Sequence, residues 1–220
     1  DDETMQAAID YAHLRGVKVF VTMNILISDD ELEEALGYAA FLYKAGADAL
    51  IIQDLGFGRL VKEKLPDFEI HLSTQATCCD VDSLEAAHEL GYKRVVPARE
   101  LSLNEIKALC STGLCDIEIF VHGAMCICYS GQCQLSRYYG GRSGNRGQCA
   151  QPCRLPYNGD GVHPLSPKDM CQIDNIGRLI DAGVYSFKIE GRMKSPEYVA
   201  WVTRIYRKYI DLYLENGDYE

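Results

Sequence analysis

The nine residues Gly46-Ala-Asp-Ala-Leu-Ile-Ile-Gln-Asp54 contain the unit on which the predicted fold is built. Residues 29–45 before them have helical periodicity, and Gly46 stands where a helix-ending left-handed residue is expected. Residues 49–54 form a short apolar run that ends in the polar pair Gln53 and Asp54. A helix that leads into a strand of this kind is typical of a parallel sheet covered on both faces.

The same pattern recurs along the chain in both directions. Further strands are predicted over residues 17–24, 69–75, 94–98, 117–122 and 186–190. Helices are predicted over residues 4–14, 83–90 and 197–216, and from a capping box that starts at Ser102 with Glu105 three positions later. Gly91, Gly113 and Gly183 stand at expected helix ends, as Gly46 does.

The spacing of these strands predicts an α/β fold. The first four intervals between strand starts are about 20 to 32 residues, the length of one βα unit, and the last interval is 69 residues. We therefore predict a TIM-type (β/α) barrel over residues 1–220, incomplete because the chain is a fragment of a longer protein, with a cysteine-rich insertion over residues 123–171. An open doubly wound sheet is the alternative, although no Gly-x-Gly-x-x-Gly follows the first strand.

The composition limits the classes of function. The chain has 22 basic and 32 acidic residues, a net charge of −10, which argues against a generally basic surface that coats nucleic acid. No apolar run is long enough to span a membrane, and the acidic first residues do not resemble a signal peptide. We expect a cytoplasmic protein with no membrane partner.

The predicted insertion differs from the rest of the chain in its charge. Residues 119–159 contain no aspartate or glutamate, and they carry Arg137, Arg142, Arg146 and Arg154. These arginines are either part of an ordinary solvated loop or a local positive patch that binds RNA phosphates or a small dicarboxylate. Tyr138 and Tyr139 in the same segment could stack on a base.

Cysteines are concentrated in the same segment. Six of the ten fall between Cys126 and Cys171, with no Cys-x-x-Cys pair of the kind that structural zinc sites use. Four thiolates from one loop in a cytosolic protein suit an iron–sulfur cluster. Disulfides are the alternative explanation.

Polar residues follow every predicted strand, at the edge where parallel βα folds place their active sites. The predicted substrate-binding residues are Asn24, Gln53, Asp54, Gln75 and Arg99, together with Arg142 and Arg154 of the insertion. The predicted catalytic residues are His122, Lys188, Glu190 and Arg192, of which Arg192 and Lys188 would hold anionic groups and His122 or Glu190 would move a proton. In the alternative structural interpretation, Asn24 and Asp54 cap helices, Glu190 pairs with Arg192, and His122 is a buried, hydrogen-bonded histidine.

Several motifs in and after the insertion resemble peptidase family U32, the collagenase-like proteases. They are Glu118-x-Phe120-x-x-Gly123-Ala124-Met125-Cys126, Gly131-x-Cys133-x-Leu135-Ser136, Asn145-Arg-Gly-Gln-Cys149-Ala-Gln-Pro-Cys153-Arg154, Ser166-Pro-Lys-Asp169-Met-Cys171 and Lys188-Ile-Glu190-Gly191-Arg192-Met193-Lys194. The strand ends at residues 20–24, 48–54 and 72–77 resemble the family as well, so the resemblance covers nearly the whole chain.

The resemblance implies more than the family name says. Relatives in this family are oxygen-independent hydroxylases with a four-iron, four-sulfur cluster that act on transfer RNA uridine, ribosomal RNA cytidine or a ubiquinone precursor, with prephenate implicated as the oxygen donor. The family's cluster ligands fall on Cys126, Cys133, Cys149 and Cys171, with Cys153 as the alternative fourth ligand.

The residues themselves favour the hydroxylases over the proteases. The sequence has no His-Glu-x-x-His motif and no evident arrangement of nucleophile and base. We therefore predict an iron–sulfur-dependent hydroxylase-type enzyme that modifies tRNA or rRNA. A U32 collagenase-like peptidase and a noncatalytic metal-binding or assembly protein are the alternatives.

Overall fold

The structure, a computed structural model, describes residues 1–130, 132–157 and 159–218. Gly131 of the second motif quoted above lies outside the described residues.

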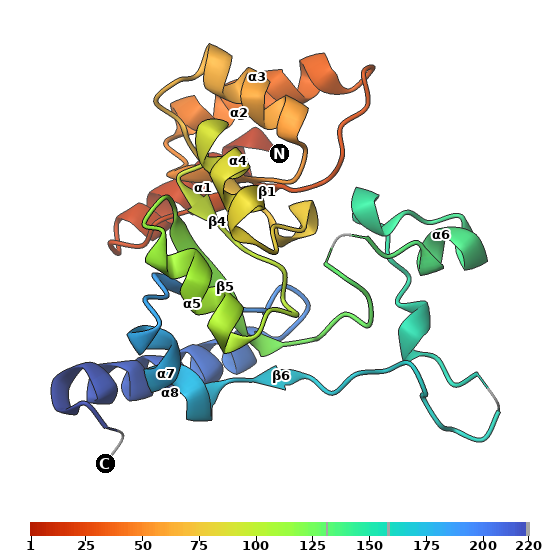
Figure 1. Ribbon diagram of the computed structural model, residues 1–220. Coiled ribbons are helices and arrows are strands. Elements are labelled where there is room, and N and C mark those ends of the chain that lie inside the picture. Colours follow the sequence, from red (N-terminus) through yellow and green to blue (C-terminus); the bar gives the residue numbers. More distant parts are fainter. Residues whose placement is uncertain (131, 158, 219–220) are drawn as a thin grey trace.

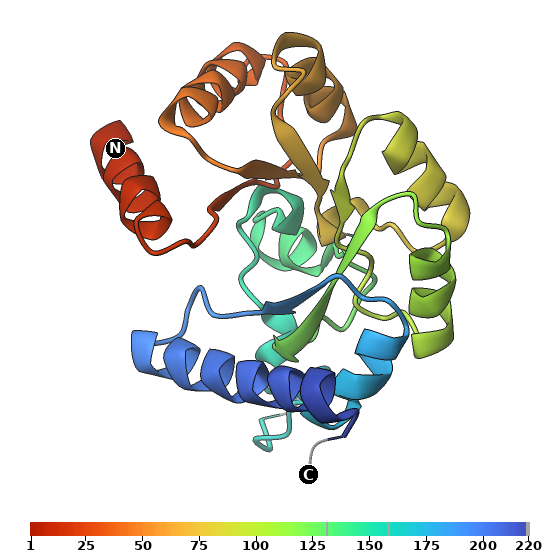
Figure 2. The same ribbon diagram turned by 90° about the vertical axis from the view of Figure 1, so that its left-hand side faces the viewer.

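A parallel sheet curled into a half-barrel forms the centre of the fold (Figure 2). Its strands are β1 (Phe20–Met23), β2 (Ala49–Ile52), β3 (Glu69–Leu72), β4 (Arg94–Val95), β5 (Asp116–Gly123), β6 (Met170–Cys171) and β7 (Ser186–Ile189). Strands β1 to β5 pair in sequence order, and β7 pairs parallel with β5. These six strands confirm the predicted α/β fold with a parallel sheet. The two-residue β6, antiparallel to the end of β5, was not predicted, because a strand this short has no periodicity.

The helices lie on the outer, convex side of the sheet (Figure 2). They are α1 (Asp2–His13), α2 (Leu32–Ala45), α3 (Leu55–Lys64), α4 (Val81–Glu89), α5 (Leu103–Ser111), α7 (Ile176–Asp181) and α8 (Pro196–Asn216). The capping box at Ser102 and Glu105 is present as predicted, and the four glycines expected at helix ends all have positive φ.

Helix α2 begins later than predicted. The expected start at residue 29 is wrong, because the carboxylate of Glu31 accepts hydrogen bonds from the backbone N–H and the hydroxyl of Ser28. These bonds close a turn before the helix, so α2 begins at Leu32.

The core lies between the sheet and these helices. All four residues of β2 are buried, which shows that both faces of the sheet are covered there. Leu50 and Ile52 pack in one cluster with Leu42 of α2 and Val61 of α3. Burial of such side chains contributes about 1.5–3 kcal/mol each.

The cysteine-rich part of the chain leaves the sheet after β5. It lies to one side of the strands and helices in Figure 1 and contains α6 (Leu135–Gly140) together with short 3₁₀ turns. It returns to the sheet at β6, where Cys171 is opposite His122. In the part of the chain that the structure describes, none of the helices has the length and apolar character that crossing a membrane requires.

Tyr92 makes an unusual contact in the core. Its side chain is buried, its hydroxyl has no hydrogen-bond partner among the described residues, and burial raises the pKa of that hydroxyl. The hydroxyl lies directly against Gly58 of α3, so a Cβ at position 58 would overlap with it.

We expect Tyr92→Phe to raise the free energy of unfolding by about 1 kcal/mol, because it removes a buried polar group that lacks a partner. Gly58→Ala should lower it by about 1–3 kcal/mol through overpacking, and the double variant should recover part of this loss. Urea denaturation measures all three variants. A Tyr92→Phe variant that is clearly less stable than the wild type would show that the hydroxyl has a stabilising partner.

Candidate active site

The candidate site lies where the carboxyl ends of β2, β3, β4 and β7 meet the cysteine-rich segment. Gln53 directly follows β2 and is buried, and its Nε2 donates to the backbone oxygen of Gln75 at 3.4 Å. Gln75 lies in the 3₁₀ turn Thr74–Ala76 that follows β3. The structure therefore brings these two predicted residues together.

Arg99, which follows β4, is the central charged residue of the site. The Nη1 atom of Arg99 donates to the backbone oxygen of Ala124 at 3.1 Å and lies 3.8 Å from the sulfur of Cys126. The same atom is 3.6 Å from a carboxylate oxygen of Glu190. The guanidinium also stacks over the ring of Phe120, 4.2 Å from its centre. Arg99 thus joins two strand ends to the first cysteine of the segment.

Three of the predicted cluster ligands line one small cavity. The cavity has a volume of about 140 Å³, and the residues around it are Thr74, Gln75, Arg99, Cys126, Tyr129, Ser130, Cys133, Gly144, Asn145 and Cys149. Its walls come from the ends of β3 and β4 and from both halves of the cysteine-rich segment. The cavity therefore depends on the way this segment folds back on the sheet.

Ser130 attaches the segment to the sheet. It is buried, and its backbone N–H and hydroxyl each donate to the carboxylate of Glu100 at 3.0 Å. The Ser130 hydroxyl also accepts the backbone N–H of Arg99, and the Ser130 carbonyl accepts the hydroxyl of Thr77. These bonds place Cys126 and Cys133, which flank Ser130 in the sequence, at the cavity.

Arg146 makes a second attachment, to the chain before α2. Its guanidinium donates to both carboxylate oxygens of Glu31 and to the backbone oxygen of Leu26. Arg146 and the serine hydrogen bonds hold the pKa of Glu31 well below its usual range. This part of the segment is thereby fixed beside the end of β1.

The other two candidate ligands lie in different surroundings. Cys153 lies in the 3₁₀ turn Pro152–Arg154, four residues after Cys149 of the cavity, and burial raises the pKa of its thiol. Cys171 lies on β6, where its sulfur is 3.9 Å from the hydroxyl of Tyr206 on α8. Neither Cys153 nor Cys171 lines the cavity.

The cysteines of the site offer thiol ligands, the ligand type that an iron–sulfur cluster takes. All ten cysteines are free thiols rather than disulfides. Among the residues that the structure describes, no three His, Cys, Asp or Glu side chains are close enough to hold one metal ion. The ligands of a four-iron cluster each bind a different iron atom, so they stand farther apart than the ligands of one ion. Soft thiolates around a shared cavity are the donor set that such a cluster requires.

Comparison with known proteins places the chain in a family. The model of peptidase family U32 matches residues 1–220. The chain belongs to peptidase family U32.

Two curated relatives and one solved structure are similar to this U32 chain. The 23S rRNA 5-hydroxycytidine synthase of Escherichia coli is 46% identical over 96% of the chain and 33% of the relative. The tRNA hydroxylation protein P1 of Bacillus subtilis is 37% identical over 96% of the chain and 54% of the relative. The chain thus spans between a third and about half of these relatives. The solved structure of a U32 peptidase superposes on 86% of this chain, and the superposed part is 76% of that peptidase. The TM-score is 0.57 at 13% sequence identity, which shows a shared fold.

The remaining predicted residues of this U32 chain do not all reach the cavity. His122 faces α8, where its Nδ1 lies 3.3 Å from the Tyr206 hydroxyl. That hydroxyl also donates to the backbone oxygen of Val121 and accepts the N–H of Gln172. His122 therefore has the surroundings of a half-buried, hydrogen-bonded histidine.

Asn24, Asp54 and Arg192 are not among the residues that line the cysteine cavity. The Asp54 carboxylate caps α3 by accepting the N–H of Phe57 and also accepts the N–H of Ile27, which matches the structural interpretation of this residue. Asn24 lines a separate cavity of about 380 Å³ beside α2. Arg192 is exposed, and in the described ranges it has no hydrogen-bond or ion-pair partner.

Arg142 and Arg154 bond within the cysteine-rich segment. Arg142 is exposed and donates to the backbone oxygen of Gln148. Arg154 donates to the Ser166 hydroxyl and to the backbone oxygens of Met125 and Pro167. Arg154 therefore shapes the segment from within.

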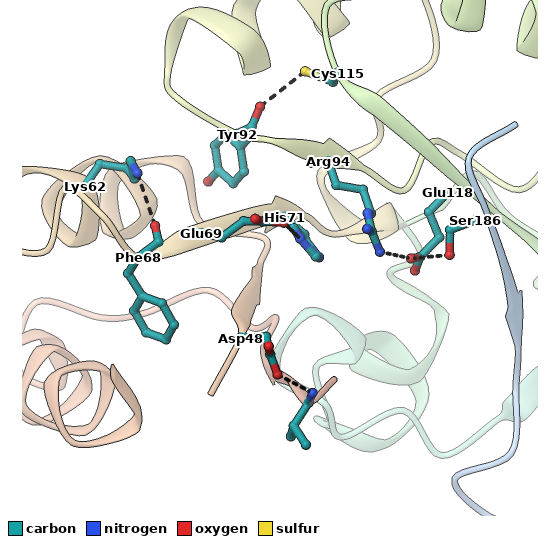
Figure 3. Close-up of polar contacts among 11 residues, drawn as sticks. Asp48, Lys62, Phe68, Glu69, His71, Tyr92, Arg94, Cys115, Glu118 and Ser186 are labelled. Carbon is teal, nitrogen blue, oxygen red and sulfur yellow. Dashed lines mark hydrogen bonds and ion pairs between the residues drawn. The ribbon is translucent and has the colours of Figure 1, made fainter. Parts of the chain in front are cut away.

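Glu118 is an important residue that sequence reasoning did not select. It is buried on β5 and accepts hydrogen bonds at 3.0 Å from Arg94, Ser186 and Lys188. Figure 3 shows Arg94, Glu118 and Ser186 directed toward one another from three neighbouring strands. Lys188, predicted to be catalytic, is thus held by an ion pair beneath Phe120. Charged residues at inward positions of three successive strands are the signal that could have revealed this network.

We expect Glu118→Gln to lower the free energy of unfolding by about 3–5 kcal/mol at neutral pH, because it leaves Arg94 and Lys188 without their buried partner. Burial alone would raise the pKa of Glu118, but Lys188 and Arg94 hold it below the ordinary value of 4.5. The stabilisation from this carboxylate is therefore complete above pH 4.5 and is lost as the pH falls through the lower, folded-state pKa.

The measurement is urea denaturation of both proteins between neutral pH and about pH 3. The gap in stability between the wild type and Glu118→Gln should narrow as the pH falls. Glu63→Gln, in an exposed pair with Arg59, is the control and should change stability by less than about 1 kcal/mol. A gap that stays constant with pH would contradict the role given to the ionised Glu118.

Proposed function

We propose that this chain is the catalytic part of an iron–sulfur-dependent, oxygen-independent hydroxylase that modifies RNA. The observation that carries the proposal is the cavity at the strand ends, where Cys126, Cys133 and Cys149 gather beside Arg99. Similar proteins that are named for making hydroxycytidine in rRNA and for hydroxylation of tRNA support it.

A four-iron, four-sulfur cluster is the proposed cofactor, and it would supply one-electron redox chemistry at the cavity. Cys126, Cys133 and Cys149 would provide three of its thiolate ligands. Cys171, which the family resemblance implies, and Cys153, which follows Cys149 by four residues, are the two candidates for the fourth. The Arg99 guanidinium would offset the negative charge of the thiolates.

Other residues of the chain would bind the reactants. Arg142, exposed on a segment without acidic residues, would contact RNA phosphates. Arg192 is exposed and unpaired within the described residues, and it would bind a carboxylate of a small oxygen donor such as prephenate. Glu190, held near Arg99, is the proposed group for moving a proton.

The proposal also covers the complete architecture of the domain and the cellular compartment of the protein. The half-barrel would be part of a TIM-type (β/α) barrel, and residues 123–171 would be an insertion after its β5 strand. Ten free thiols are consistent with the cytoplasm, where thiols remain reduced.

Peptidase activity is the second candidate, because the family carries that name. The sulfur of Cys115 lies 4.0 Å from Nδ1 of His88. Cys115 is buried, however, and burial raises its pKa to about 11. A thiol with this pKa is almost entirely protonated at neutral pH and is a poor nucleophile. This contact therefore does not favour proteolysis.

The cofactor proposal is tested by iron and sulfide analysis of protein that is purified and reconstituted without oxygen. Cys126→Ser should lose most of the iron, the sulfide and the visible absorbance of the cluster. Cys128→Ser is the matched control, since Cys128 is in the same segment but does not line the cavity, and it should keep them. Whichever of Cys153→Ser and Cys171→Ser loses the cluster identifies the fourth ligand. Wild-type protein with neither iron nor sulfide would refute the proposal.

The activity is tested by mass spectrometry of nucleosides from the RNA of a strain that lacks the gene. We expect one hydroxylated nucleoside to disappear and to return with the wild-type gene. Arg192→Ala should fail to restore it while retaining its iron, whereas Cys126→Ser should lose both. If all hydroxylated nucleosides persist in the deletion strain, and purified Cys126→Ser protein still cleaves peptides, the peptidase is the correct function.

A further inference from the structure

Tyr129 is placed at the cysteine cavity but is not buried by it. It is one of the cavity-lining residues, yet 67% of its surface is exposed to solvent. The turn that carries it is fixed, because its backbone oxygen accepts the N–H of Gln132 and the next residue is the buried Ser130. A large flat ring is thus held at the mouth of the cavity.

Two amide side chains in the same cavity lack partners. The side-chain oxygen of Gln75 is buried and has no hydrogen-bond partner among the described residues. The side chain of Asn145 makes no hydrogen bond within the described ranges, although its backbone oxygen accepts the N–H of Leu26. Amides offer both a donor and an acceptor, which are the groups needed to read the hydrogen-bonding edge of a base.

The size of the cavity limits its occupant. A volume of about 140 Å³ is well below that of pockets that enclose whole drug-sized ligands, which start at about 300 Å³. A cluster bound to Cys126, Cys133 and Cys149 would fill this space, so a planar ring would lie at the mouth of the cavity, with its sugar and phosphate outside.

The surroundings outside the cavity suit a negatively charged strand. Tyr138 and Tyr139 on α6 are 85% and 73% exposed, and Arg137 and Arg142 on either side are exposed as well. Residues 119–159 contain no acidic residue in a chain of net charge −10. Exposed aromatic rings interleaved with arginines are the usual surface for single-stranded nucleic acid.

We propose that Tyr129 is the stacking platform for the target base, an unpaired base in single-stranded RNA that is held at the mouth of the cysteine cavity and is read by Gln75 and Asn145. Tyr138, Tyr139, Arg137 and Arg142 bind the flanking nucleotides. This inference rests on the proposed function, because it identifies how that site receives its substrate.

The test uses the full-length protein and a hairpin RNA whose loop carries a fluorescent cytidine analogue. Stacking on Tyr129 should change the fluorescence of the analogue, and Tyr129→Ala should abolish that change and weaken binding on the order of ten- to a hundredfold. Tyr129→Phe should behave within about twofold of the wild type, since it retains the aromatic face. Tyr11→Ala, at a tyrosine of similar exposure on α1, is the matched control and should have no effect.

The outcomes separate this inference from the function on which it rests. If Tyr129→Ala binds the loop, changes its fluorescence and restores RNA modification as the wild type does, the stacking role is wrong and the hydroxylase proposal stands. If Tyr129→Phe is as defective as Tyr129→Ala, the hydroxyl rather than the ring is important, and the stacking role is also wrong. If the wild type supports no RNA modification in the deletion strain, the proposed function itself fails.

Discussion

The buried carboxylate of Glu118 is the interaction that connects the two parts of this half-barrel. It accepts hydrogen bonds from Arg94 on β4 and from Ser186 and Lys188 on β7. Strands β5 and β7 are neighbours in the sheet, although the long cysteine-rich segment separates them in sequence. Strands that are close in sequence find each other through short loops, but β7 must return over 60 residues to pair with β5. A buried charge with three partners specifies one register for that pairing, because any other register would leave charges unpaired in the core.

Most strands and helices of the half-barrel could be predicted from the sequence, because the signals that define them lie within a few residues of each element. Short apolar runs, capping residues and helix-ending glycines each act within a few residues, and all six parallel strands were found in this way. Helix α3 was not predicted, because Gly56 and Gly58 weaken its helical character. Strand β6 and helix α6 were not predicted, since they are too short to show periodicity and depend on contacts with distant parts of the chain.

The candidate site was predictable to a smaller extent. The general rule for strand ends correctly brought Gln53, Gln75, Arg99 and Glu190 to one edge of the sheet, beside the cysteines. The rule does not tell which way a side chain points. His122 faces the tyrosines of α8, and Asp54 caps a helix. Glu118 was not predicted because its partners, residues 94, 186 and 188, lie on other strands, so that the network shows only when the charged positions of the three strands are compared.

The two attachments of the cysteine-rich segment leave the exposed face of α6 independent of the cavity. Ser130 and Arg146 hold the segment to the strand ends through Glu100 and Glu31, while α6 with its exposed tyrosines and arginines lies between these two attachments. Substitutions on the exposed face of α6 leave both attachments and the cavity cysteines in place. The surface of α6 can therefore change in charge and shape while the cavity and its cysteines stay in place.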